Sequence, residues 1–129
     1  MNHTTNRNRI IIGCNEAPLL RILSLALSQQ GLEIDVAGSH RELIRRCRKE
    51  SYALIITRFV RPLLRDDAPL LSGACGAKLP PIFVLSHTRD QRIVVHLLER
   101  GVSQFLSLPI SLARLSSKVA QQLHSSDAN

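Results

Sequence analysis

The pattern of apolar and polar residues predicts five β-strands along the chain. Residues 9–14, 52–57 and 81–86 are almost continuously apolar. Such runs are typical of strands that are buried on both faces in the middle of a parallel sheet. Residues 32–36 alternate between apolar and polar side chains, which predicts a strand with one exposed face near the sheet edge. A fifth, short strand is predicted at residues 103–107.

Apolar residues at helical spacing lie between these strands. Helices are therefore predicted at about residues 16–30, 40–50, 89–100 and 112–124. Asn15, Ser39 and Ser111 stand where N-terminal caps are expected. The positions predicted to be buried on the four helices are Leu19, Leu20, Leu23, Ala26, Leu27, Leu43, Ile44, Cys47, Ile93, Val94, Leu97, Leu98, Leu112, Leu115, Val119 and Leu123.

Strands that alternate with helices predict an α/β fold, a doubly wound five-stranded parallel sheet with helices on both faces. The third crossover, residues 63–79, contains a proline and two glycines, so its helix is predicted to be short or distorted. Because crossovers are right-handed and the second strand is amphipathic, the strand order 2-1-3-4-5 fits best. The domain is predicted to span residues 9–124, between a disordered leader (1–8) and a frayed tail (125–129).

Charge and cysteine content limit the partners and the cellular compartment that we expect for this domain. The 129 residues carry a formal net charge of +7, from 17 Lys and Arg against 10 Asp and Glu, which permits a nucleic-acid or acidic partner without establishing one. Cys14, Cys47 and Cys75 show no zinc or redox spacing and are expected to be free thiols in a reducing compartment. With no signal-peptide pattern and no apolar run of about 18 residues, the expected location is the cytoplasm.

Thr57 and Arg58 end the central apolar run. In open α/β sheets, ligands bind just beyond the carboxyl ends of the strands, so any chemistry is expected near these two residues. The chain has no Gly-rich phosphate-binding loop, which argues against a flavodoxin-like enzyme. Because Arg58 ends the central strand, a functional site at that strand end must accommodate its guanidinium group.

The chain resembles the receiver domains of two-component response regulators. The resemblance covers almost the whole sequence and rests on four segments in the order and spacing of that family, residues 9–18, 55–62, 84–86 and 101–111. It implies the flavodoxin-like receiver fold and a role in bacterial signal transduction or transcriptional control. It also implies a cis peptide bond between Leu108 and Pro109.

The residues that carry the family's chemistry are replaced in this chain. By the resemblance, the acidic pair that binds magnesium matches Cys14 and Asn15, and the phosphoacceptor aspartate matches Arg58. The lysine that neutralises the phosphoryl group matches Leu108. A thiol and an amide are poor ligands for a hard cation, and an arginine cannot form an acyl phosphate. These replacements predict a degenerate pseudo-receiver with no catalytic residue, no metal and no cofactor.

Two positions keep the residue type that the family uses to transmit phosphorylation. Ser86 matches the Thr/Ser switch, and Phe105 matches the aromatic switch. Phe105 lacks the hydroxyl group of a tyrosine, so it can point inward without leaving a buried polar group unpaired.

Arg58 leaves two interpretations open. With Ser86 and His87 it could form an anion site, because an arginine fork suits phosphate or carboxylate. Alternatively it pairs with an acidic side chain and is purely structural. The acidic candidates are Glu16, Asp66 and Asp67.

Cys14 and the nearby acid suggest two further uses of the pocket. A nucleophilic Cys14 would need a lowered pKa, which Arg58 could supply, but no histidine base stands beside it in the sequence. Asn15 and Glu16 could be the remnant of a metal site, although they offer only one carboxylate.

The predicted helix at residues 40–50 carries a strong positive charge. Five basic residues stand against Glu42 and Glu50. They could contact phosphate groups of a nucleic acid, which gives an alternative function as a basic nucleic-acid-associated regulator. The absence of interleaved aromatic residues and of a helix-turn-helix pattern favours an ordinary solvated helix face. The basic residues are Arg41, Arg45, Arg46, Arg48 and Lys49.

The sequence therefore predicts a non-enzymatic receiver-like module that works without phosphorylation, through contact with a protein partner or a second copy. An effector domain could follow Asn129, and no membrane contact is expected. By the resemblance, the interaction face lies on the last two helices and the fifth strand. Its exposed residues are expected to be Gln91, Arg92, Val95, Glu99, Gln104 and Arg114.

Overall fold

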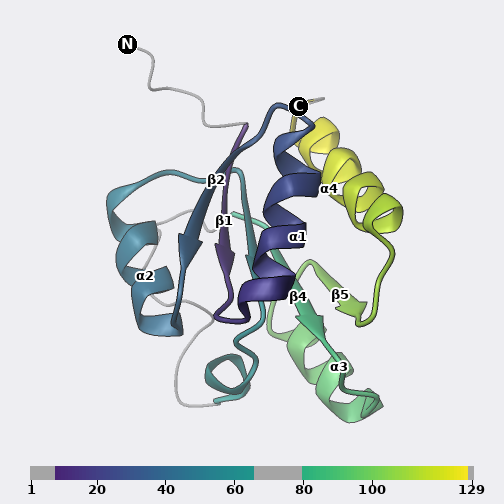
Figure 1. Cartoon of the computed structure of the whole chain (residues 1–129). Coiled ribbons are helices and arrows are strands. Elements are labelled where there is room, and N and C mark those ends of the chain that lie inside the picture. The colour runs from purple at the N-terminus through teal and green to yellow at the C-terminus, as the bar shows by residue number, and fades with distance from the viewer. Residues whose placement is uncertain (1–7, 66–79, 128–129) are drawn as a thin grey trace.

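The computed structural model describes residues 8–65 and 80–127, which form a parallel sheet of five strands (Figure 1). The strands lie in the order β2-β1-β3-β4-β5. They are β1 (Arg9–Gly13), β2 (Glu33–Ala37), β3 (Leu54–Thr57), β4 (Ile82–Ser86) and β5 (Gln104–Ser107). The predicted α/β fold and its strand order are confirmed. The alternating strand, β2, lies at one edge and keeps Glu33 exposed, as its pattern indicated.

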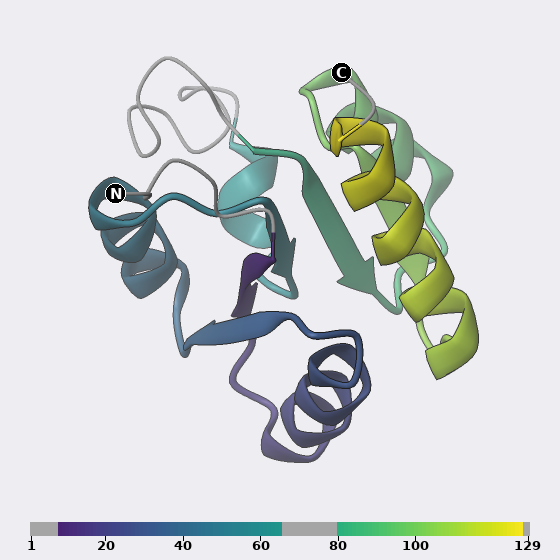
Figure 2. The same cartoon turned by 90° about the horizontal axis from the view of Figure 1, so that it is seen from above.

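Helices cover both faces of the sheet (Figures 1 and 2). They are α1 (Ala17–Ser28), α2 (His40–Lys49), the 3₁₀ helix η1 (Arg61–Leu64), α3 (Gln91–Glu99) and α4 (Leu112–Asp127). Residues of α1 and α4 pack against one face of the sheet, together with Ile10 and Ile12 of β1. Residues of α2, η1 and α3 pack against the other face with Ile11. Alternate residues of one buried strand thus serve two separate apolar layers.

The helix boundaries correct several expectations. Asn15 does not cap α1: Glu16 occupies the N-cap position and its side chain makes no capping bond. Ser39 does cap α2, accepting from the Glu42 N–H at 3.1 Å, and Ser111 accepts from the Arg114 N–H at 3.0 Å at the start of α4.

Two apolar residues that were predicted to be buried are exposed. Leu98 on α3 is 45% exposed, and Leu112 on α4 is 41% exposed. Leu98 lies at the margin of the apolar face of α3, and Leu112 is the first residue of α4, so spacing alone does not decide whether the sheet reaches these side chains.

The third crossover begins with the short helix η1, as expected. The remainder of the predicted segment 63–79, including Cys75, lies outside the described residues from position 66 onward, as does most of the predicted leader. Helix α4 continues to Asp127, into the stretch that was expected to fray. The Leu108–Pro109 peptide bond is cis, as the resemblance predicted. None of the described helices is long and apolar enough to cross a membrane.

A polar network ties the β2 edge to its neighbours. The carboxylate of Asp35 accepts a hydrogen bond from the Tyr52 hydroxyl at 2.7 Å and pairs with Arg9 at 3.1 Å and Arg46 at 3.2 Å. Arg9 also pairs with Glu50 at 3.0 Å. Burial and the bond to Asp35 raise the pKa of Tyr52 to about 12. Burial opposes ionisation of Asp35, but the bond from Tyr52 and the two arginines hold its pKa below the ordinary value.

Candidate functional site

The carboxyl ends of β1, β3 and β4 meet at one edge of the sheet. Gly13 stands opposite Thr57, and Thr57 stands opposite Val84 in the next strand. The Arg58 N–H donates to the Gly13 carbonyl at 2.8 Å, so the chain leaves β3 directly beside the end of β1. The site predicted near Thr57 and Arg58 is therefore assembled from three strand ends.

Arg58 fills the middle of this site. Its Nη2 lies 2.6 Å from a carboxylate oxygen of Glu16, at the start of α1. Its Nη1 donates to the Leu85 carbonyl in β4 at 3.1 Å. The side chain is only 16% exposed, and its Nε has no hydrogen-bond partner among the residues that the structure describes. The guanidinium thus bridges the β1–α1 turn and β4 from its position at the end of β3.

This geometry supports the structural interpretation of Arg58 over the anion site. The cation is paired with Glu16, one of its three acidic candidates; the other two, Asp66 and Asp67, lie outside the described residues. The Ser86 hydroxyl accepts a hydrogen bond from the Thr88 N–H at 3.1 Å, which turns the chain after β4. His87 is exposed.

Cys14 lies beneath this ion pair and is 1% exposed. Its sulfur accepts a weak hydrogen bond from the Glu16 N–H at 3.4 Å. Burial raises the pKa of the Cys14 thiol, and this effect outweighs the lowering by Arg58. The thiol is therefore protonated near neutral pH, which removes the basis for a nucleophilic Cys14.

The neighbouring residues leave little room at the strand ends. The Thr57 hydroxyl is buried and accepts from the Phe59 N–H at 3.0 Å. A Cβ on Gly13 would lie 3.1 Å from the Thr57 hydroxyl oxygen and 3.2 Å from both Leu43 and Phe59. A side chain at position 13 would therefore require these neighbours to move by a few tenths of an ångström.

The residues at this edge do not fit the magnesium ion that receiver domains bind. Cys14 is a buried thiol, Asn15 is exposed, and the only carboxylate among them, Glu16, is paired with a guanidinium. Magnesium prefers an octahedron of oxygen ligands and would also be repelled by Arg58. Within the described parts of the chain, no group of three or more His, Cys, Asp or Glu side chains could hold a metal ion.

The two switch positions and the lysine position lie around β5. Phe105 is half-buried and packs against the α2 and α3 layer, so it points inward as expected. Leu108 packs against the α1 and α4 layer, and its N–H donates to the Ser86 carbonyl at 2.8 Å. Leu108, at the position of the family's lysine, is thus a partly buried residue at the edge of the apolar core.

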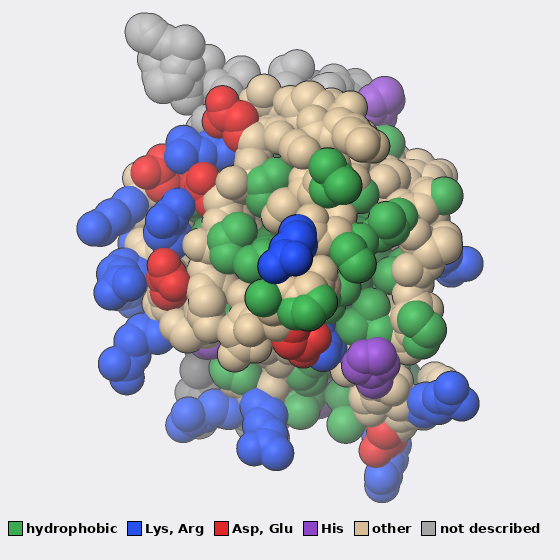
Figure 3. All heavy atoms as spheres, viewed as in Figure 1, with side chains coloured by type: hydrophobic (Ala, Val, Ile, Leu, Met, Phe, Trp, Pro, Cys, Tyr) green, Lys and Arg blue, Asp and Glu red, His purple; other side chains and the backbone are tan. Residues whose placement is uncertain are grey.

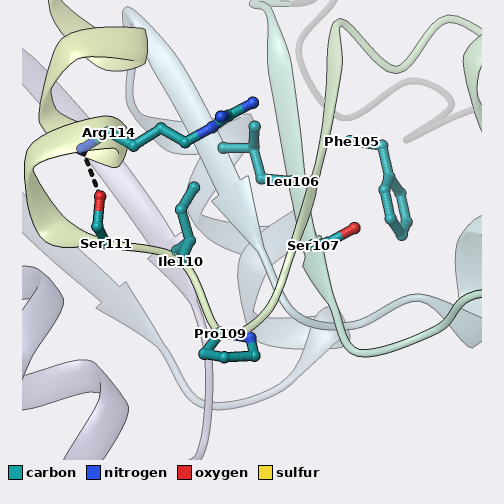
Figure 4. A pocket seen from close by; sticks show the side chains of 7 residues that line it. All are labelled: Phe105, Leu106, Ser107, Pro109, Ile110, Ser111 and Arg114. Carbon is teal, nitrogen blue, oxygen red and sulfur yellow. Dashed lines mark hydrogen bonds between the residues drawn. The ribbon is translucent and has the colours of Figure 1, made fainter.

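The predicted interaction face is largely exposed. Its residues on α3 and α4 are exposed, and Gln104 on the edge strand β5 is half-buried. A hollow of about 480 Å³ opens beside β5 and the start of α4. Figure 4 shows the Arg114 side chain reaching from α4 across this hollow toward Leu106.

Comparison with known proteins places this geometry in a structural class. No protein-family model matches the sequence, and no curated protein matches it. Solved structures do match: a two-component response regulator from Clostridium difficile has a TM-score of 0.76 at 19% identity, over 91% of this chain and 96% of that one. The chain has the receiver fold.

Two other structures with the receiver fold also match this chain. The beryllofluoride-activated receiver domain dimer of NtrC4 matches with a TM-score of 0.73 at 16% identity, over 92% of this chain and 98% of that one. A member of a family of streptococcal redox sensors evolved from two-component response regulators matches with a TM-score of 0.78 at 21% identity. The match covers 93% of this chain and 52% of that protein, so this chain spans about half its length.

Two groups of the site were missed by sequence reasoning. The Leu85 carbonyl is a main-chain group 27 positions from Arg58, and no side-chain pattern points to it. The close approach at Gly13 did have a signal, because a glycine that ends an apolar run often marks close backbone packing.

Proposed function

We propose that this chain is a receiver-like signalling module that acts by protein–protein contact and without phosphorylation. The observation that carries the proposal is the Arg58–Glu16 ion pair, 2.6 Å long, at the position of the phosphoacceptor. On this proposal the protein is not an enzyme, works in the bacterial cytoplasm, and belongs to signal transduction or transcriptional control.

Electrostatics supports the loss of phosphorylation. By the resemblance, Arg58 replaces the group that would accept the phosphoryl, and its charge would repel a divalent metal nearby. Leu108 replaces the cation that would neutralise the product, and a lysine there would bring a like charge toward the guanidinium. The replacements at positions 58 and 108 are compatible with each other. They indicate that the whole pocket has lost the residues for phosphorylation, and that the loss is not limited to one substitution.

The surface on α3, β5 and α4 is the proposed contact face. It carries exposed residues of mixed chemistry, including Val95, which is 48% exposed. NtrC4 is described as a receiver domain dimer, and the streptococcal relative as a redox sensor derived from response regulators. These two proteins support the idea that the receiver fold serves both association and signals of a different kind.

Acetyl phosphate provides the direct test. We expect no phosphoryl adduct by intact-mass measurement after incubation with acetyl phosphate and magnesium, whereas a receiver domain with an acceptor aspartate, treated in parallel, gains one. Arg58→Asp alone is expected to remain unmodified, because Cys14 and Asn15 supply no carboxylate for the metal. A phosphoryl adduct on the wild-type chain would overturn the proposal.

A further inference from the structure

Helix α2 presents a row of arginines on its outer side. Arg41, Arg45 and Arg48 are exposed and line a hollow of about 500 Å³ together with Ile44 and His40. We call these three arginines the α2 basic surface. At 1.5 Å of rise per residue, they extend over about 10 Å of the helix axis. Figure 3 shows Lys and Arg side chains gathered on the side of the molecule where Figure 1 places α2.

The acidic residues near this surface are already engaged elsewhere. The Glu42 carboxylate accepts from the Gly38 N–H at 2.8 Å. Glu50 pairs with Arg9 at 3.0 Å, and Asp35 pairs with Arg46 at 3.2 Å. Among residues 8–65 and 80–127, no carboxylate forms an ion pair with any of the three arginines of the surface. Within the described part of the chain, their charge is therefore not paired with a carboxylate, and it is exposed to an anionic partner.

The composition of the surface favours phosphate groups over a protein partner. Protein interfaces are anchored by an apolar core rich in aromatic residues. Here no Phe, Tyr or Trp side chain is among the described residues that line the hollow, and its one aliphatic residue, Ile44, is half-buried and packs against the protein's own core. Arginine, in contrast, binds phosphate with two parallel donors.

The shape of the surface favours duplex DNA over duplex RNA. The arginines stand on the exposed side of a helix. The major groove of DNA is wide enough to admit a helix, whereas that of duplex RNA is deep and narrow. Duplex DNA presents roughly six phosphate charges along 10 Å of its axis, enough for all three arginines. We propose that the α2 basic surface binds the phosphate backbone of duplex DNA without reading its sequence.

Fluorescence polarisation with a labelled random-sequence 20-base-pair DNA duplex tests this proposal in the full chain. We expect binding at low salt that weakens as salt is added. The triple variant Arg41→Gln, Arg45→Gln, Arg48→Gln should bind at least tenfold more weakly. Its slope of log K against log salt should be shallower by about 2.7, the value for three phosphate contacts. Glutamine is a good helix former, and circular dichroism checks that the variant stays folded.

A matched triple variant separates this surface from net charge. Arg21→Gln, Arg61→Gln, Arg89→Gln removes three exposed charges that lie on neither the α2 basic surface nor the proposed contact face. Its DNA affinity should stay within about twofold of wild type. Equal weakening by both triple variants would overturn the proposal, as would the absence of DNA binding at low salt. Equally tight binding of duplex RNA or of poly-glutamate would also overturn it. These outcomes leave the phosphorylation-independent role untouched, because that role rests on Arg58.

Discussion

Within residues 8–65 and 80–127, Arg58 is held by one carboxylate and one main-chain carbonyl, and its Nε lacks a partner. A cation in this position costs solvation energy, and the pairing must offset that cost. Glu16 is 46% exposed, so water screens the ion pair and limits what it contributes to folding. The guanidinium therefore has a larger effect on what the pocket can bind than on how stable the fold is.

Substitutions at the two ends of this pair should reflect that balance. Glu16→Gln removes the carboxylate but leaves the cation, and we expect it to lower the free energy of unfolding by about 1 kcal/mol. Arg58→Met removes the cation and its desolvation cost, and the apolar side chain should keep stability within about 1 kcal/mol of wild type. Urea denaturation measures both values.

Arg89→Met is the matched control, because Arg89 is exposed, and surface changes of this kind stay within about 0.5 kcal/mol. A loss above about 3 kcal/mol for Arg58→Met would show that the guanidinium is essential to the fold.

At the scale of the element, α2 begins with two reciprocal contacts. Ser39 accepts from the Glu42 N–H, and the Glu42 carboxylate accepts from the Gly38 N–H. His40 follows the cap, and burial lowers its pKa. The positive end of the helix dipole also disfavours a charged imidazole there.

The His40 pKa predicts a pH dependence of stability. Because the pKa is lower in the folded protein, the unfolded chain binds more protons when the pH falls below about 6.5, the ordinary histidine value. Stability should therefore be fully present above that pH and should decrease on acidification. His40→Gln should lose less stability than wild type between pH 7.5 and 5.5 in urea denaturation. An identical pH dependence in both proteins would contradict the prediction.

The sequence predicted the positions of the strands better than it predicted the ends of the helices. The alternation of β2 placed it at an edge, and the continuous apolar runs placed β1 and β3 inside, because burial on one or two faces leaves a direct trace in residue type. The cap of α1 was wrong, since Glu16 rather than Asn15 occupies that position and its side chain turns to Arg58. The start of α1 depends on a contact between segments that are far apart in the sequence, and the local spacing of residues does not predict such a contact.

For the whole molecule, the pocket and the outer face are expected to be uncoupled. A ligand changes the balance between conformations only if it binds one of them more tightly. If Arg58 excludes the phosphoryl group, as we propose, the contacts of the α3, β5 and α4 face should depend on sequence and concentration alone.

Sedimentation measurements test this expectation. The mass distribution should be the same with and without beryllofluoride and magnesium, at each of several protein concentrations. A receiver domain that retains the acceptor aspartate serves as the positive control. A shift toward larger species with the phosphoryl mimic would show that the pocket still senses an anion.

Strand β1 is secured at both ends by arginines. Arg9 pairs with Asp35 and Glu50 at its start, and the Arg58 N–H bonds to Gly13 at its end. Between them, Ile11 and Ile12 are fully buried and paired with strands on both sides. Their amide hydrogens should exchange with deuterated solvent only when the entire domain opens. A deuterium label at these two positions would record each complete unfolding of the molecule and pass over the fraying of its outer helices.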